Sequence, residues 1–146
     1  DDGKLFDTRK IYIENNDYIL DVIEKVISHI KDSSIKLIDN CETEKLILKD
    51  QIPHAFITFP KLSEKDGMLY PEMSLKNAIN IIRSCSKPFP GAFVLNEKNK
   101  KIRIWSVCDY KSKNYKNHER FITFENDLLY LELSDGFLES NNYEIL

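Results

Sequence analysis

The side chains of this chain that are best suited to binding chemistry are cations gathered in one segment. From Lys87 to Arg120 the sequence holds nine lysines or arginines and only three acids. The whole chain of 146 residues carries a formal net charge of −3, so acids dominate elsewhere. A basic segment on an acidic chain suits the phosphates of a nucleotide or of RNA. The competing interpretation is a solvated, lysine-rich loop.

Side chains that commonly ligate metals or act as acids and bases are scattered. The three histidines and the three cysteines form no paired motif: His29, His54, His118, Cys41, Cys85 and Cys108. The sequence has no HExxH, no GxSxG and no glycine-rich phosphate loop. An odd number of cysteines without CxxC spacing argues against a disulfide framework and suits a reducing compartment. No apolar run reaches the ~18 residues of a membrane span, so we expect a cytoplasmic protein without a metal and without a membrane partner.

The elements before residue 62 are a predicted strand and a predicted helix. Alternation of apolar and polar residues favours a strand over Lys4–Ile13. A helix follows the capping candidates Asn15, Asn16 and Asp17 and extends to about Lys31, because five β-branched residues share one face: Ile19, Ile23, Val26, Ile27 and Ile30. Residues 35–48 fit either a continuation of this helix or a short strand. Residues 51–59 indicate an extended connector.

A junction occupies the stretch from Asp66 to Phe93. It opens with a turn at Asp66-Gly67, and a short amphipathic helix follows with an apolar stripe made of Leu75, Ala78, Ile79 and Ile82. The corner Pro88-Phe89-Pro90-Gly91 then ends the helix, because proline restricts the residue before it and glycine permits a sharp change of direction.

Period-two patterning dominates the chain after the junction. One hairpin is predicted from residues 92–95 and 102–108, and a second from residues 121–124 and 128–133. A polar loop over residues 109–119 separates the hairpins. A turn at 134–136 leads into a last strand that ends near residues 143–146. Four or five short strands joined by short turns predict a small closed barrel.

The junction carries a recognisable order of residues. It consists of Asp66-Gly67, then Ile81-Ile82-Arg83-Ser84, then Pro88-Phe89-Pro90-Gly91-Ala92-Phe93, and finally Lys101 four residues before Trp105. This order resembles the signature of the folate-dependent N-formyltransferases, which include methionyl-tRNA formyltransferase and the nucleotide-amino-sugar formyltransferases. Ser134-Asp135-Gly136-Phe137-Leu138 resembles a late turn of the same family.

The resemblance implies a fold of the α/β plus β class. Residues 1–62 would be the tail of a Rossmann-like formyltransferase domain, residues 63–87 a linker and junction helix, and residues 88–146 an OB-like C-terminal barrel. The family's N-x-H element and its site for 10-formyltetrahydrofolate would then lie in an N-terminal catalytic half that precedes this sequence. We therefore expect the chain alone to be inactive.

The start of the chain resembles the family's D-x-G-x-[IL] element. Asp1-Asp2-Gly3-Lys4-Leu5 matches it, and the resemblance makes Asp1 the catalytic aspartate. The alternative is a frayed terminal residue without a role. Asp7-Thr8 is a competing match to the family's D-T-G form, but Arg9 stands where that form has glycine.

The implied reaction is transfer of a formyl group to a primary amine. The family's histidine would take up the amine proton while the aspartate holds its tautomer, and the family's asparagine would stabilise the developing oxyanion. The resemblance favours a nucleotide-linked amino sugar as the acceptor. The barrel would end ten residues after Gly136, whereas the family's tRNA enzymes tend to carry a longer one, and the first motif resembles the sugar branch's D-x-G more than D-T-G. The basic segment favours initiator tRNA as the alternative.

Five cations are candidates for contacts with the acceptor: Lys61, Arg83, Lys111, Lys113 and Lys116. Arg83 has a second interpretation, a salt bridge that pins the helix. Tyr70-Pro71 and Ser84 depart from the family pattern, which has an acidic-tryptophan pair and an alanine at these places. A non-catalytic binding or dimerisation module, including a homodimer, therefore stays open.

Overall fold

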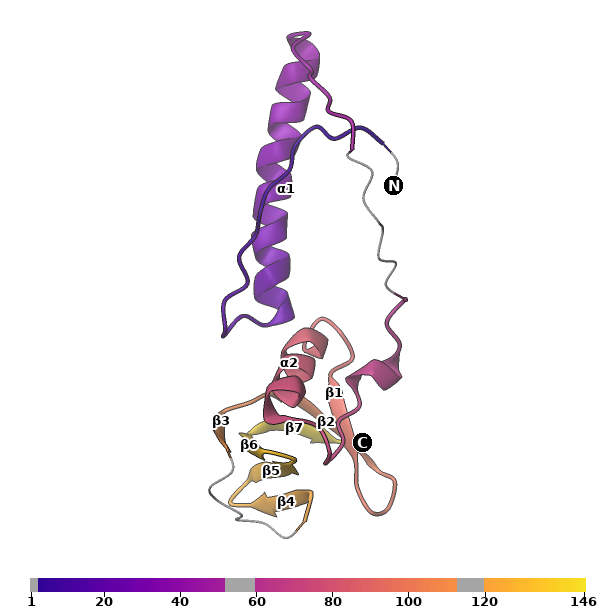
Figure 1. The fold of residues 1–146 in the computed structure, drawn as a ribbon, viewed down its shortest axis with the longest axis vertical. Helices are drawn as coiled ribbons and strands as arrows, with labels where there is room; N and C mark the ends of the chain where they lie inside the picture. The colour runs from indigo at the N-terminus through magenta and orange to yellow at the C-terminus, as the bar shows by residue number, and fades with distance from the viewer. Residues whose placement is uncertain (1–2, 52–59, 113–119) are drawn as a thin grey trace. The chain divides into compact units, whose positions relative to one another are not determined.

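The chain divides into two compact units. A computed structural model describes residues 3–51, 60–112 and 120–146. The first unit consists of residues 1–17 with 21–61, and the second of residues 18–20 with 62–146. Figure 1 shows that the described helices and strands make an α+β fold, with the strands gathered in the second unit.

One long helix dominates the first unit. Helix α1 spans Ile19–Glu42, so the helical continuation is correct for residues 35–42. The strand predicted over Lys4–Ile13 is wrong, because in this stretch only Leu5 finds a partner, in an isolated antiparallel bridge to Lys49. Alternation of residue types does not make a strand when no neighbouring strand completes the ladder. The connector predicted over residues 51–59 lies almost wholly outside the described residues.

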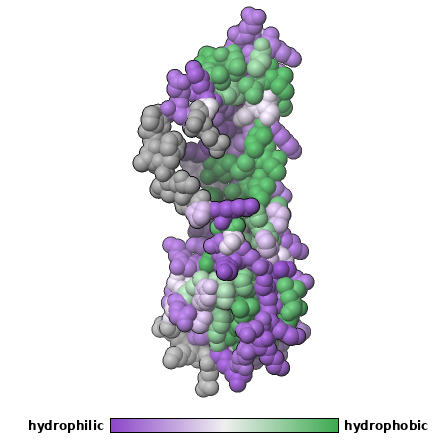
Figure 2. All heavy atoms as spheres, turned by 90° about the vertical axis from the view of Figure 1, so that its right-hand side faces the viewer, coloured by the Kyte–Doolittle hydropathy of each residue, from purple (hydrophilic) through white to green (hydrophobic). Residues whose placement is uncertain are grey.

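Helix α1 carries an apolar face that the described residues cover only in part. None of its 24 residues is buried, and Ile30 and Ile38 are each 57% exposed. Apolar atoms gather over this helix in the space-filling view (Figure 2). An amphipathic helix gains most of its stability from packing that face, and α1 leaves much of it exposed within the described residues.

The second unit begins with two short helical elements. A 3₁₀ turn, η1, spans Glu64–Gly67, where we predicted a turn. Helix α2 spans Leu75–Cys85 and confirms the amphipathic helix of the junction. Ser74 caps it by accepting a hydrogen bond from the N–H of Asn77. The residues that α2 buries follow its apolar stripe: Leu75, Ala78 and Ile82.

In the described part of the chain, seven strands form two antiparallel sheets. The first sheet has the order β1-β2-β7, with β1 at Ala92–Leu95, β2 at Lys101–Ser106 and β7 at Asn142–Ile145. The second has the order β3-β6-β5-β4, with β3 at Asp109–Ser112, β6 at Gly136–Ser140, β5 at Leu128–Leu133 and β4 at Ile122–Glu125. Both predicted hairpins are confirmed, as β1–β2 and β4–β5.

The predicted closed barrel is wrong, because the strands divide between two sheets. The pairing of β2 with β7 shifts register between Ile104 and Ser106, and the chain then leaves this sheet to start β3 in the other. The polar loop predicted over residues 109–119 is also wrong at its start, since β3 pairs with β6 there. The Rossmann-like and OB-like assignments stay predictions.

The core of the second unit lies among α2 and both sheets. Strand β2 buries Ile102 and Ile104, while β5 buries Leu129, Leu131 and Leu133 in strict alternation. Burying one such side chain contributes about 1.5–3 kcal/mol. None of the helices in the described ranges has the length and apolar content of a membrane span.

Gly136 offers a direct test of this sheet packing. A Cβ at this position would lie 2.3 Å from the carbonyl oxygen of Lys111 on β3. We expect Gly136→Ala to lower the free energy of unfolding by about 1–3 kcal/mol, as overpacking does. Urea unfolding followed by circular dichroism measures the loss.

The matched control for this substitution is Gly3→Ala. A Cβ at Gly3 would meet no atom within 4 Å, so its urea midpoint should stay that of the parent chain. Equal midpoints for Gly136→Ala and the parent would contradict the β3–β6 packing.

Candidate functional site

The residues of the junction converge on Gly91. Its φ is +87°, a conformation that side chains other than glycine rarely adopt. A Cβ here would lie 2.7 Å from Cγ of Arg103 and 3.0 Å from Cζ3 of Trp105. A Cβ at Gly67 would in turn lie 3.2 Å from the carbonyl oxygen of Gly91. The two glycines therefore let η1, the corner and β2 approach one another closely.

Trp105 is the aromatic centre of this cluster. The Nζ of Lys87 lies 5.2 Å from its ring centroid, and Cζ of Arg103 lies 5.5 Å away. Both distances are within the range of cation–π attraction. Ser86, which is buried, donates a hydrogen bond of 2.8 Å to the carbonyl oxygen of Trp105, and Arg103 also pairs with Glu144 at 3.5 Å.

The two aspartates of the family-like turns are engaged in backbone capping. Asp66 accepts hydrogen bonds from the N–H and the hydroxyl of Ser63, at 2.6 and 2.8 Å. These bonds lower the pKa of Asp66 below its ordinary value. Asp135 accepts a 2.6 Å hydrogen bond from the N–H of Leu75 and so ties its turn to the start of α2. Both carboxylates are therefore scaffold groups.

Among the described residues, the predicted substrate-binding cations lie on different elements. Lys61 is exposed and belongs to the first unit. Arg83 lies on α2 with its side chain partly buried, whereas Lys111 lies on β3 with its Nζ 5.8 Å from the ring centroid of Phe137. The remaining predicted residues, Asp1, Lys113 and Lys116, lie outside the described residues.

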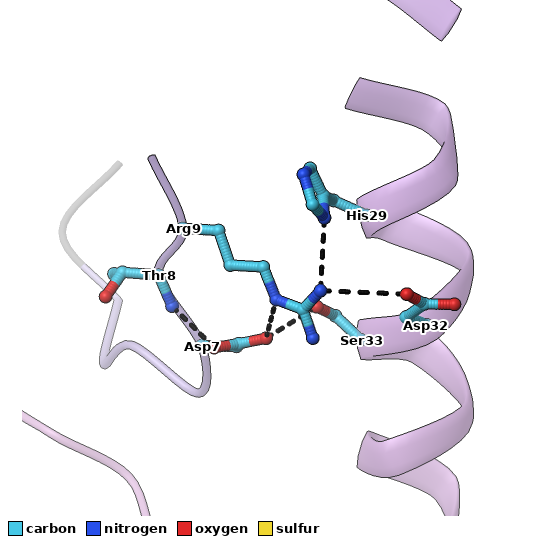
Figure 3. Close-up of polar contacts among 6 residues, drawn as sticks. All are labelled: Asp7, Thr8, Arg9, His29, Asp32 and Ser33. Atoms are coloured by element: carbon cyan, nitrogen blue, oxygen red, sulfur yellow. Dashed lines mark hydrogen bonds and ion pairs between the residues drawn. The ribbon is translucent and has the colours of Figure 1, made fainter. Parts of the chain in front are cut away.

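A polar cluster in the first unit gathers around Arg9 (Figure 3). Its Nη1 lies 3.1 Å from Nδ1 of His29 and 3.6 Å from Oδ2 of Asp32. Its Nε lies 3.4 Å from Oδ2 of Asp7, and Ser33 donates a 2.6 Å hydrogen bond to the same oxygen. Helix α1 thus supplies three of the partners through one exposed stripe.

The chemistry of this cluster follows from its donors and acceptors. A guanidinium only donates, so Nδ1 of His29 acts as the acceptor in its contact with Arg9. Ser33 donates to Asp7 and lies in no hydrogen bond with His29, so the cluster is not a nucleophilic triad. Its geometry links the segment around Asp7 to α1.

Asp7 also lines a groove of ≈440 Å³ in the first unit. Its walls are residues 5–8 and residues 49–51. The walls are joined by paired backbone hydrogen bonds of 2.8 Å between Leu5 and Lys49, and by a 3.5 Å ion pair between Lys4 and Asp50. Asp7-Thr8, the competing match to the family's D-T-G form, contributes a carboxylate and a hydroxyl to the lining of this groove.

Sequence reasoning missed Arg9, Asp32 and Ser33 as members of this cluster. The partners of these contacts are 20 to 26 residues apart in the sequence, so no local pattern predicts the contacts. A helical stripe at His29, Asp32 and Ser33 is the one signal available, since residues three and four apart share a face. Within the described ranges, no group of three or more histidines, cysteines or acids is placed to hold a metal ion.

Comparisons with models of known protein families and with curated proteins find no match for this chain.

The effect of the Ser33–Asp7 hydrogen bond on the titration of Asp7 can be tested. That bond, more than the nearby charge of Arg9, holds the pKa of Asp7 below its ordinary value. A lowered pKa stabilises the fold above the unfolded pKa of about 3.9, and this contribution is lost as the pH falls through the folded pKa. We expect Ser33→Ala to raise the pKa of Asp7 towards the ordinary value, as measured by carboxyl ¹³C NMR.

Ser34→Ala is the matched control, because Ser34 is an exposed neighbour on the same helix. Its Asp7 titration should overlay that of the parent. The hydrogen bond would be refuted if both serine variants titrated alike.

Proposed function

We propose that this chain is the C-terminal portion of an N-formyltransferase. The enzyme would transfer a formyl group from 10-formyltetrahydrofolate to the primary amine of a nucleotide-linked amino sugar. One observation carries the proposal: the family-like residues, spread from Asp66 to Trp105, pack against one another in the second unit. Gly67, Gly91 and Trp105 meet at the point where helix, corner and strand join, which gives the resemblance a physical basis.

The second unit acts as an accessory scaffold in this proposal. Asp66 and Asp135 are occupied as caps, so neither is assigned a proton-transfer role. The family's N-x-H element has no counterpart in the sequence, and no step of the reaction is assigned to the described residues alone. Asp1 would supply the carboxylate that orients the catalytic histidine of the preceding half.

Helix α1 supports the need for that preceding half. A 24-residue helix with no buried residue gains little from its own unit and exposes isoleucines that favour an apolar neighbour. We propose that the catalytic half of the same enzyme covers this face. The chain would then be active only as part of that larger protein.

The acceptor would be held through its phosphates. The described candidates are Arg83 and Lys111 in the second unit and Lys61 in the first. Lys113 and Lys116, which lie outside the described residues, are proposed as further candidates. A diphosphate requires only one or two of these cations, whereas tRNA would use many. Initiator tRNA stays the alternative acceptor because the basic segment is long.

Formyl transfer by defined proteins tests the proposal. The purified 146-residue chain should give no transfer from 10-formyltetrahydrofolate, and the chain joined to its preceding half should formylate a nucleotide-linked amino sugar. In the joined protein, Asp1→Asn should lower kcat by about 10²–10⁴-fold, the usual contribution of acid–base groups.

Asp2→Asn is the matched control and should leave kcat within about twofold, since the resemblance assigns no catalytic role to this carboxylate. Single-turnover kinetics measure the chemical step separately from product release. Full activity of Asp1→Asn, or transfer by the short chain alone, contradicts the assignment. Activity on initiator tRNA instead of the sugar would shift the acceptor to the alternative.

A further inference from the structure

A second groove lies in the second unit, away from the junction cluster. It has a volume of ≈490 Å³ and lies between the turn after β1 and the residues that lead into β4. We call it the β1–β4 groove. Its size falls within the ~300–1,000 Å³ typical of small-molecule pockets. All of its lining residues belong to the described part of the chain.

The floor of the β1–β4 groove is apolar and aromatic. Leu95, Phe121, Ile122 and Phe124 line it. Phe124 is 47% exposed, and its ring packs against Tyr143 with 5.6 Å between centroids and a 50° tilt. Tyr143 supports the ring from one side, so Phe124 is a held aromatic surface that a planar ligand can stack on.

The rim of the groove carries two cations. Lys98 and Arg120 both line it and are exposed, and neither forms an ion pair with another described residue. Among the described lining residues, Glu97 is the one carboxylate beside these two cations, so positive charge predominates there. Cations at the edge of an aromatic floor suit a ligand with a planar ring at one end and anionic oxygens at the other.

Hydrogen bonds to Asn96 fix the turn that carries Lys98. Asn96 Oδ1 accepts hydrogen bonds of 2.9 Å from the N–H groups of both Lys98 and Lys100. The N–H of Asn96 bonds to the carbonyl of Lys100 at 3.0 Å, and Asn99 adopts a positive φ of 56° that closes the turn. Lys98 therefore projects from a closed, hydrogen-bonded turn.

We propose that the β1–β4 groove binds a nucleoside diphosphate. Its base would stack on Phe124, and its phosphates would be bound by Lys98 and Arg120. Two cations match two phosphates, and the groove is bounded by one turn and one strand entry, whereas a nucleic acid strand would need cations along a longer track. The inference stands independently of formyl transfer, because it uses none of the residues assigned to that reaction.

Calorimetric titration of the 146-residue chain with ADP, at low salt, tests the site. We expect one ADP per chain. Arg120→Gln and Lys98→Gln should each weaken binding about tenfold, the usual order for a charged hydrogen bond. Phe124→Leu should weaken ADP about tenfold while leaving inorganic pyrophosphate unchanged, since only ADP stacks.

Lys76→Gln is the matched control, because Lys76 is an exposed lysine on α2 outside the groove. It should bind ADP as the parent does, and all variants should keep the parent's circular dichroism. No ADP heat at millimolar concentration, or equal affinities for every variant, overturns the site. Tighter binding of a single-stranded oligonucleotide, with a salt dependence implying several phosphate contacts, would overturn it in favour of nucleic acid.

A failed ADP titration leaves the formyl-transfer proposal standing. Conversely, absence of formyl transfer with intact ADP binding would contradict the formyl-transfer proposal and leave the ADP site standing.

Discussion

The close approach of the backbone at Gly91 is the constraint on which the second unit depends. Its N–H bonds to the carbonyl of Cys85 at 2.8 Å and so ends α2. Its Cα faces the side chains of Arg103 and Trp105 with no room for a Cβ. The end of the helix, the corner and the central strand of one sheet are therefore joined at a single residue, and its positive φ makes glycine the residue that fits.

Much of the polar chemistry in the second unit is used to maintain this arrangement. The carboxylate of Asp135 is bound to the start of α2, the hydroxyl of Ser86 to β2, and the ammonium of Lys101 to Glu64 at 2.5 Å. Lys101 lowers the pKa of Glu64, which keeps that carboxylate charged. Groups tied in this way stabilise the fold, whereas Lys98 and Arg120 are exposed and form no ion pair with another described residue.

The elements that local pattern determines were predictable from the sequence. The stripe at Leu75, Ala78 and Ile82 defines α2, and alternation at Ile102 and Ile104 defines β2, because both periods are set by neighbouring residues. The division of the strands between two sheets was not predictable, since no local pattern marks the register shift near Ser106, after which the chain leaves the first sheet. Strand β3 was missed because its four residues, all exposed, show no apolar alternation.

The residues of the candidate sites also differ in whether a local sequence pattern predicts them. The junction glycines stand out in the sequence, whereas the bond from Leu75 to Asp135 spans 60 residues and the Arg9–His29 contact spans 20. Such contacts arise only once tertiary structure brings the segments together. Predicted roles for Asp1, Lys113 and Lys116 stay predictions, because these residues lie outside the described part of the chain.

We propose that α1 presents one side of an interface that a preceding catalytic half would complete. Hydrogen–deuterium exchange across α1 measures this most directly, on the 146-residue chain and on the chain joined to that half. The account predicts fast exchange over Ile19–Glu42 in the short chain and strong protection in the joined protein, because an uncovered helix face leaves the helix to open locally. Equal exchange in the two proteins would contradict it.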